Sequence, residues 1–422
     1  MENNNHDLNN EPELPEEKPG FRARLFKPLI LAAATVVAAA CICIIIAMVV
    51  SPSGTGDAAG KRPDSPEQSL AENSSAQSPA LFEEPDENNL SNLVKRADLT
   101  LINLLKSSDI SMSELKLEDV SLKKYQGHDF HFQELSFPCK GDKKEFIDRV
   151  QAGLLDAGLN ATVHEVSADS WLISINGVPT HKFSLLTPAP TAPAPIVTSS
   201  NAPKMAIVID DMGEDLRLAE GLAALERPVT FSIWPNSSHV GRTVKIARKH
   251  GIEIMIHLPM QPKGYPKVNP GSDALLVGMS GNKIRMTVNE AVKKVPGAVG
   301  LNNHMGSKFT EDYKGMKEVM AALKKHRLFF LDSRTTPDSA GPKAARIAGV
   351  TLYERNIFLD NVKDVSAIKY QLSKAAEVAR KKGQSIAIGH PHRETLKAIR
   401  LWMKENRGRV NIVPVHMLVP KG

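Results

Sequence analysis

Cysteine is scarce in this chain, with three residues among 422. Two of them, Cys41 and Cys43, lie inside one apolar run, which leaves Cys139 as the only thiol in the rest of the sequence. A single thiol cannot form an intrachain disulfide or supply the sulfur ligands of a structural zinc site. Any metal bound outside the apolar run must therefore be held by histidine and carboxylate.

Charged residues are absent from Leu29 to Val50, a run of 22 residues in which Thr35 is the only polar side chain. About 20 apolar residues span a bilayer, whereas the apolar core of a cleaved signal peptide is roughly 7 to 15 residues long. We therefore predict an uncleaved transmembrane helix over residues 29–50. The alternative is a buried helix of a soluble domain, but the run has no amphipathic break.

The residues before this helix predict its orientation. Residues 1–28 begin as a polar tail rich in Asn, Glu and Pro and end with Arg22, Arg24 and Lys27. Such a basic flank stays in the cytoplasm by the positive-inside rule. We expect a single-pass protein of the cell inner membrane, with its N-terminus cytoplasmic and everything after Ser51 in the periplasm.

Acidic residues are few after Lys204, where 20 Asp and Glu accompany 36 Lys and Arg, a net charge of +16 in a chain whose total is +6. A basic domain suits an anionic polymer, an anionic lipid surface or a nucleic acid, and a solvated surface explains most such residues equally well. Outside the cytoplasm we expect no nucleic-acid partner. Charge alone does not choose among the other partners, and it is compatible with an anionic polymer as the substrate.

Two segments have the composition of linkers. Residues 51–89 are rich in Ser, Pro, Ala and Glu, which is typical of a flexible spacer. Residues 187–203 alternate Pro with small residues and favour an extended, stiff spacer. The linkers define a module at 90–186 and a larger domain at 204–422.

The module is predicted to be a small α+β domain with a structural or binding role. Apolar spacing indicates helices from Leu93 to Leu105 and from Phe146 to Leu155. Residues 161–164 and 171–175 alternate like paired strands, and Asn176-Gly177 is a turn signal.

From Lys204 onward, short apolar runs alternate with helical stretches. This pattern predicts repeated βα units and a parallel sheet, open or closed into a barrel. Helices are expected at 216–225, 241–250 and 314–325. Strands are expected at 206–209, 229–234, 253–256, 299–301, 329–331, 350–352, 386–388 and 412–413.

Five of these strands end in residues that can bind a metal or transfer a proton. One such end could be a helix cap or a structural histidine, but the carboxyl ends of parallel strands meet at one face, where α/β proteins place their chemistry. Five at one face therefore indicate a site. The five ends are Asp210-Asp211, His257, Asn302-Asn303-His304, Asp332-Ser333-Arg334 and His390-Pro391-His392.

These residue types suit metal-assisted hydrolysis. One Asp and two His can hold a divalent ion, most simply Zn²⁺, with an open position for water and a polarised carbonyl. A second carboxylate can accept the proton of that water, and a His on the far side can protonate the leaving group.

The domain at 204–422 resembles the divergent polysaccharide deacetylases, a branch of the polysaccharide deacetylase superfamily with an irregular (β/α) barrel. The resemblance covers about half of the chain. It is carried by the segments Ile209-Asp210-Asp211-Met212-Gly213, Val229-Thr230-Phe231, Trp234-Pro235, Glu253 to Met260, Asn302 to Ser307, Leu331 to Thr335 and Gly389-His390-Pro391.

The resemblance implies a role for each strand end. Asp210 matches the general base, Asp211 a metal ligand, and His257 the first metal histidine. His390 matches the general acid, with His392 as a second candidate.

The sequence departs from the superfamily pattern at two points. The second ligand histidine lies four residues after the first, and Gln261 occupies that position here, so we expect His304 to replace it. An Arg-containing motif is also absent, and we expect Arg334, beside Asp332, to orient the catalytic carboxylate instead.

The sequence thus predicts a membrane-anchored, metal-dependent hydrolase that removes acyl groups, in the first place N-acetyl, from an envelope polysaccharide or peptidoglycan-type substrate. Two alternatives stay open: a non-catalytic glycan-binding or cell-wall scaffold protein, and a metal-dependent phosphoesterase. The second usually needs two metals, for which carboxylates are few.

Overall fold

The computed structural model describes residues 90–421 apart from 113, 127, 140 and 187–201. The predicted tail and transmembrane helix, the first linker and most of the second lie outside the described residues. Within the described ranges, no helix has the length and apolar character needed to cross a membrane.

The module forms a five-stranded sheet with two helices. Its strand order is β1-β2-β5-β4-β3, in which β2 and β5 run parallel and the other neighbours antiparallel. Both predicted helices and the predicted strand pair are present, whereas β1, β2 and β5 were not predicted. The elements are α2 (Leu90–Ser107), β1 (Lys116–Tyr125), β2 (His128–Pro138), α3 (Lys143–Asp156), β3 (Ala161–Ser167), β4 (Ser170–Ile175) and β5 (Val178–Leu186).

The larger domain is a parallel sheet with the order β11-β10-β9-β8-β7-β6-β13-β12, and β14 pairs with β6. All eight predicted strands are present, and β12 is an additional one. The path is open between β11 and β12, so the sheet is a half-barrel. The strands are β6 (Lys204–Met212), β7 (Thr230–Ile233), β8 (Ile254–Met260), β9 (Gly300–Met305), β10 (Phe329–Asp332), β11 (Leu352–Glu354), β12 (Ile357–Phe358), β13 (Gln384–Gly389) and β14 (Asn411–Ile412).

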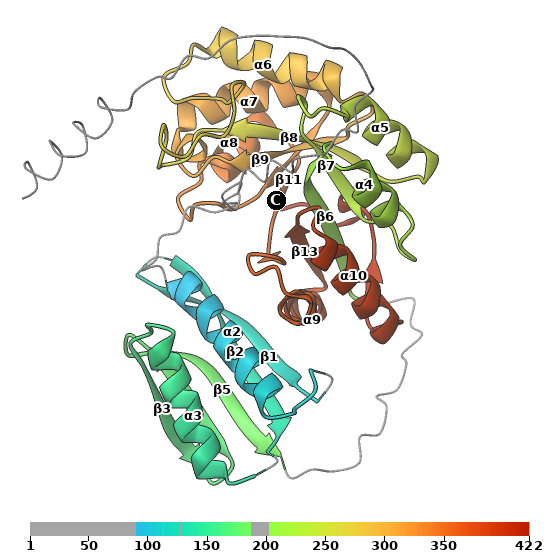
Figure 1. Ribbon diagram of the computed structural model, residues 1–422. Helices are drawn as coiled ribbons and strands as arrows, with labels where there is room; N and C mark the ends of the chain where they lie inside the picture. Colours follow the sequence, from blue (N-terminus) through green and yellow to red (C-terminus); the bar gives the residue numbers. More distant parts are fainter. Residues whose placement is uncertain (1–89, 113, 127, 140, 187–201, 422) are drawn as a thin grey trace, which may run out of the picture. The chain divides into compact units, whose positions relative to one another are not determined.

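Helices connect most successive strands, with β11 and β12 as the exception, and lie around the outside of the sheet (Figure 1). Their caps follow from the sequence: Asp215 accepts from two backbone N–H groups at the start of α4, and Asp364 does the same for α9. The helices are α4 (Leu216–Ala223), α5 (Val240–Lys249), α6 (Gly281–Lys294), α7 (Tyr313–His326), α8 (Gly341–Ala348), α9 (Val365–Lys382) and α10 (Arg393–Glu405).

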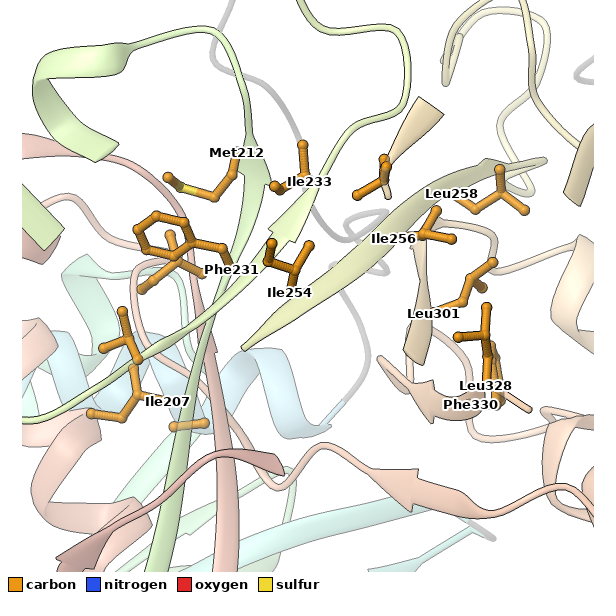
Figure 2. Close-up of a cluster of buried hydrophobic side chains, with 14 of the residues drawn as sticks. Ile207, Met212, Phe231, Ile233, Ile254, Ile256, Leu258, Leu301, Leu328 and Phe330 are labelled. Carbon is orange, nitrogen blue, oxygen red and sulfur yellow. The ribbon is translucent and has the colours of Figure 1, made fainter. Parts of the chain in front are cut away.

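Alternate residues of each strand serve two different cores. On β6, Ile207 and Ile209 pack in the core under the helices, while Ala206 and Val208 pack in a smaller core on the inner face of the sheet. Figure 2 shows the helix-facing set on β6, β7 and β8. Both faces are buried, which explains why the strands are almost wholly apolar.

The same alternation decides which residues at the strand ends point inward. Asp210 follows Val208 on the inner face, His257 follows Met255, and His390 follows Ile388. The inner face of the half-barrel therefore changes from an apolar core to a polar group at the carboxyl ends of the strands.

Helix α9 also contributes to the core of the module. Ala367 and Tyr370 are buried among the module's apolar residues, and the Lys374 ammonium lies 3.2 Å from the Asp98 carboxylate of α2. Both charged side chains are almost completely buried.

A glycine after β6 allows the chain to turn beside the strand ends. Gly213 has a φ of 129°, and a Cβ atom there would overlap the Ser237 side chain. We expect Gly213→Ala to destabilise the protein by about 1–3 kcal/mol, because both the backbone conformation and the Ser237 contact resist a side chain. Thermal unfolding measures the effect. Gly241→Ala, in α5 with open space around it, should be neutral or slightly stabilising, and equal losses in both variants would contradict the argument.

Candidate active site

Adjacent acids on a strand normally point to opposite faces, but Asp210 and Asp211 both reach the inner site. The pairing of β6 with β7 shifts register between Ile209 and Met212, and Asp211 adopts a left-handed φ of 50°. This local bulge turns the second carboxylate to the side of the first. A non-glycine residue in this conformation is strained, and such strain is concentrated at functional sites. Helix capping does not explain the pair, because Asp215 caps α4.

Three side-chain atoms form a small triangle next to Asp210. Asp211 Oδ1 lies 3.1 Å from His257 Nε2 and 3.0 Å from His304 Nδ1, and the two nitrogens are 3.2 Å apart. Ligand atoms of a tetrahedral Zn²⁺ are separated by about 3.3 Å, given bonds of about 2.0–2.1 Å. The Asp211 oxygen is buried and has no hydrogen-bond partner of good geometry among the described residues. The triangle therefore fits a divalent cation with these three ligands.

Asn302 holds Asp210 and His257 in one arrangement. Its Nδ2 donates to both Asp210 carboxylate oxygens, at 2.9 and 3.0 Å, and its Oδ1 lies 2.8 Å from His257 Nδ1. An imidazole that donates from Nδ1 presents the lone pair of Nε2, which is the atom in the triangle. Asn302 pairs directly with His257 in the β8–β9 register, and Ser232 of β7 donates to its Oδ1.

His304 lies on the same face as Asn302 because the two are separated by one residue of β9. Its ring stacks on Trp234, with centroids 5.2 Å apart, and meets the His257 ring edge-on. Trp234 therefore limits the rotation of the His304 ring.

The charges of the site perturb one another strongly. Burial raises the pKa of Asp210, although His257 and His390 oppose that shift. Burial also acts to raise the pKa of Asp211, but His304 and His257 outweigh it and hold that pKa well below its usual range. Burial lowers the pKa of His257, and the two carboxylates reverse this to about 9. Without a cation, a proton on His257 therefore compensates the negative charge.

A second pair stands at the end of β13. His390 Nδ1 lies 2.8 Å from Asp360 Oδ1, while Asp360 Oδ2 accepts from the His390 N–H and the Thr395 hydroxyl, both at 2.6 Å. Although burial opposes it, Asp360 raises the pKa of His390, and Asp211 and Asp210 add to this effect. The contact therefore favours a protonated His390 beside an ionised Asp360, with Nδ1 of His390 toward the carboxylate.

Four other residues considered from the sequence lie outside the triangle and the His390–Asp360 pair. Asp332 points to the helix-facing side of β10, as Phe330 does two residues earlier. Its carboxylate accepts from Ser339 and from the Arg334 backbone N–H. The Arg334 guanidinium lies near Glu354 and Asp129, so the expectation that it orients Asp210 is corrected, and Asn302 has that position. Gln261 accepts from the Val277 N–H in a loop. The fourth, His392, follows His390 at the start of α10, with ring centroids 6.2 Å apart.

Asn302, Asp360 and Trp234 were not predicted as site residues. A signal was available for each. Asn302 and Trp234 have the inward parity of their strands, and Asp360 follows the inward Phe358 of β12, a strand of two residues that the apolar pattern does not reveal.

Comparison with known proteins identifies relatives of the larger domain. A family model described as divergent polysaccharide deacetylase matches residues 207–419, just over half of the chain. The uncharacterized protein YibQ of Escherichia coli (strain K12) is 38% identical over 198 residues, which cover 47% of this chain and 61% of that protein. An uncharacterized protein of Haemophilus influenzae (strain ATCC 51907 / DSM 11121 / KW20 / Rd) is 38% identical over 201 residues, which cover 48% of this chain and 71% of that protein.

Among solved structures, an uncharacterized protein from Agrobacterium tumefaciens C58 is similar, with a TM-score of 0.50 and 27% sequence identity. The similarity covers 52% of this chain and 89% of that one. The family match spans all the strand ends that form the site, from Asp210 to His390. The chain therefore belongs to the divergent polysaccharide deacetylase family.

Proposed function

We propose that this protein is a metal-dependent hydrolase that removes N-acyl groups, in the first place N-acetyl, from an envelope polysaccharide. One observation carries the proposal: a buried carboxylate, a three-ligand triangle and a His–Asp pair meet at the carboxyl ends of the strands. The proposal includes the transmembrane helix at 29–50 and the periplasmic location, which the sequence predicts.

Each group has a chemical task in this proposal. Asp211, His257 and His304 would hold the cation, and Zn²⁺ suits one carboxylate and two imidazoles. Such an ion, when bound, acidifies water and polarises an acyl carbonyl. Asp210 accepts the proton of the attacking water as a C–O bond forms at the acyl carbon. His390 donates its Nε2 proton to the nitrogen as the C–N bond breaks, which releases a carboxylic acid and the amine of the sugar.

The positioning residues support these tasks. Asn302 keeps both Asp210 oxygens close to the triangle, and Asp360 fixes the orientation of the His390 ring through Nδ1. The base must be ionised and the acid protonated, so activity should rise with pH through the raised pKa of Asp210 and fall through the raised pKa of His390.

A single-metal site also separates this proposal from the phosphoesterase alternative. Within the described residues, one group of three metal-capable side chains is close enough to share an ion. Phosphoesterases of the two-metal type need a second group about 4 Å away.

The test uses the full-length chain. Metal content is measured by elemental analysis, and acetate release is measured from acetylated glycans before and after removal of the metal with a chelator and its restoration. We expect bound metal and chelator-sensitive release of acetate. A folded protein that binds metal and glycan but releases no acetate would support a glycan-binding role instead, and activity on phosphate esters alone would support a phosphoesterase.

Metal affinity should depend on pH because a cation and a proton compete for His257. The pKa of this residue is raised to about 9, and a metal binds only the unprotonated nitrogen. Below pH 9, apparent affinity should therefore rise up to about tenfold per pH unit, and about one proton should leave for each ion bound at pH 7. Titration calorimetry in buffers of different ionisation enthalpy measures the released protons. No proton release at pH 7 would contradict this account.

A further inference from the structure

The segment that contains Asp360, the partner of the proposed acid His390, also contacts the module. Asp360, which orients His390, is followed two residues later by Val362, which packs against the apolar core of the module. The next residues continue the contact: Asp364 accepts from Lys106 of α2 at 2.9 Å, and Ala367 is buried in the module's core. The His390 partner and the docking residues thus belong to one short piece of chain.

Docking is centred on a buried ion pair that the module surrounds with hydrogen bonds. The Asp98 Oδ2 atom faces Lys374, while Asp98 Oδ1 lies 2.9 Å from His181 Nε2 and accepts from Gln133 Nε2 at 2.7 Å. Tyr370 of α9 donates to Gln133 Oε1 at 2.5 Å. A buried charge is stable only while its partners are in place, because an unpaired buried charge is costly. Other positions of the module would break these contacts, so the contact favours a single docked position.

We propose that the module is a positioning element of the active site, which holds residues 362–374 in place and thereby keeps Asp360 against His390. The inference rests on the proposed function, because it concerns His390 as the acid of that reaction. It gives residues 90–186 a role in the reaction rather than that of a separate attached domain.

Charged and titratable groups around His390 come from three elements. Asp360 precedes α9, Asp210 and Asp211 end β6, and His392 begins α10. Asp360 is the carboxylate in direct contact, so its displacement would lower the pKa of His390 even with the other two acids in place. A lower pKa reduces the fraction of His390 that carries a proton at a given pH. The loss of this proton donor matters most when the leaving group is a poor one.

The test compares two substrates in the full-length chain. Hydrolysis of an N-acetyl glycan requires protonation of the leaving amine, whereas an aryl acetate releases a phenolate that needs none. Asp98→Asn leaves Lys374 without its counter-charge. We expect it to slow the glycan reaction about tenfold or more and the aryl acetate reaction less than about twofold. Equal losses on both substrates, or no loss on either, would overturn the proposal.

Two further variants serve as controls. Asp98→Asn with Lys374→Met removes both charges and keeps an acceptor for Gln133 and His181. This double variant should restore the parent ratio of the glycan rate to the aryl acetate rate. Lys182→Met removes an ion pair with Glu134 on the opposite face of β5 from His181, and it should leave the ratio unchanged. If Asp98→Asn does not fold, Tyr370→Phe removes the hydrogen bond to Gln133 alone and should change the ratio in the same direction.

A measurement without substrate separates this inference from the proposed function. The pKa of His390 is measured by NMR of the histidine-labelled full-length chain, with assignment from His390→Gln. It should be lower in Asp98→Asn than in the parent, and unchanged in Lys182→Met. If the parent hydrolyses neither substrate, the proposed function fails while this comparison still decides the inference, and an unchanged His390 pKa would overturn it.

Discussion

His304→Gln is expected to remove the metal from the full-length chain and its acyl hydrolase activity with it. The triangle would supply three ligand atoms, and the loss of Nδ1 leaves Asp211 and His257, one fewer than the three protein ligands of an open tetrahedral site. Loss of an outer partner alone costs about 10- to 100-fold in metal affinity, so loss of a ligand should cost more. Metal titration of the chelator-treated protein measures the change.

The control for this prediction carries the same substitution at another histidine. His416→Gln changes a half-exposed residue that pairs with Glu253, and metal affinity should stay at the parent level. Adding Gln261→His to His304→Gln should not restore binding, because the Gln261 side chain is engaged with the Val277 N–H in its loop. Retention of parent affinity by His304→Gln would show that the triangle is not the metal site.

Asp210→Asn is expected to keep the metal and lower the rate of acyl hydrolysis by about 10²- to 10⁴-fold, the range attributed to general acid–base catalysis. Asparagine keeps the shape of the side chain beside Asn302 but cannot accept a proton. Because the pKa of Asp210 is raised, the ionised form opposes folding above its unfolded pKa, so the variant should be as stable as the parent at pH 7 or more stable.

Asp332→Asn is the matched control for Asp210→Asn. Both carboxylates are completely buried and both have a raised pKa, but Asp332 bonds Ser339 and the Arg334 N–H in its own loop. We expect rates within a few-fold of the parent. Equal rate losses in the two variants would mean that the loss follows from burial of a carboxylate and not from base catalysis.

The half-barrel could be predicted from the sequence because its strands are buried on both faces. Runs such as Ala206 to Ile209 are apolar without alternation, and the helices between them have turn and cap signals at their ends. Strand β12 was missed because two residues have no period, and Asp360 was missed with it.

The alternation of side chains between the two faces of each strand explains how the predicted site residues are placed. Ala206 and Val208 lead to an inward Asp210, and Leu331 leads to an inward Ser333, so Asp332 points the other way. Parity alone would also have turned Asp211 outward. The bulge that turns it inward depends on pairing with β7 and a strained φ, and neither has a signature in the residue letters.

The stacking of Trp234 on His304 provides an optical reporter of the site. The other two tryptophans lie elsewhere, Trp171 beside Phe183 in the module and Trp402 as a completely buried residue of α10. Trp234 is the tryptophan whose ring touches one of the three proposed ligands. A cation that withdraws electron density from the His304 ring would alter the emission of this indole, so the intrinsic fluorescence of the unlabelled protein should follow metal occupancy in real time.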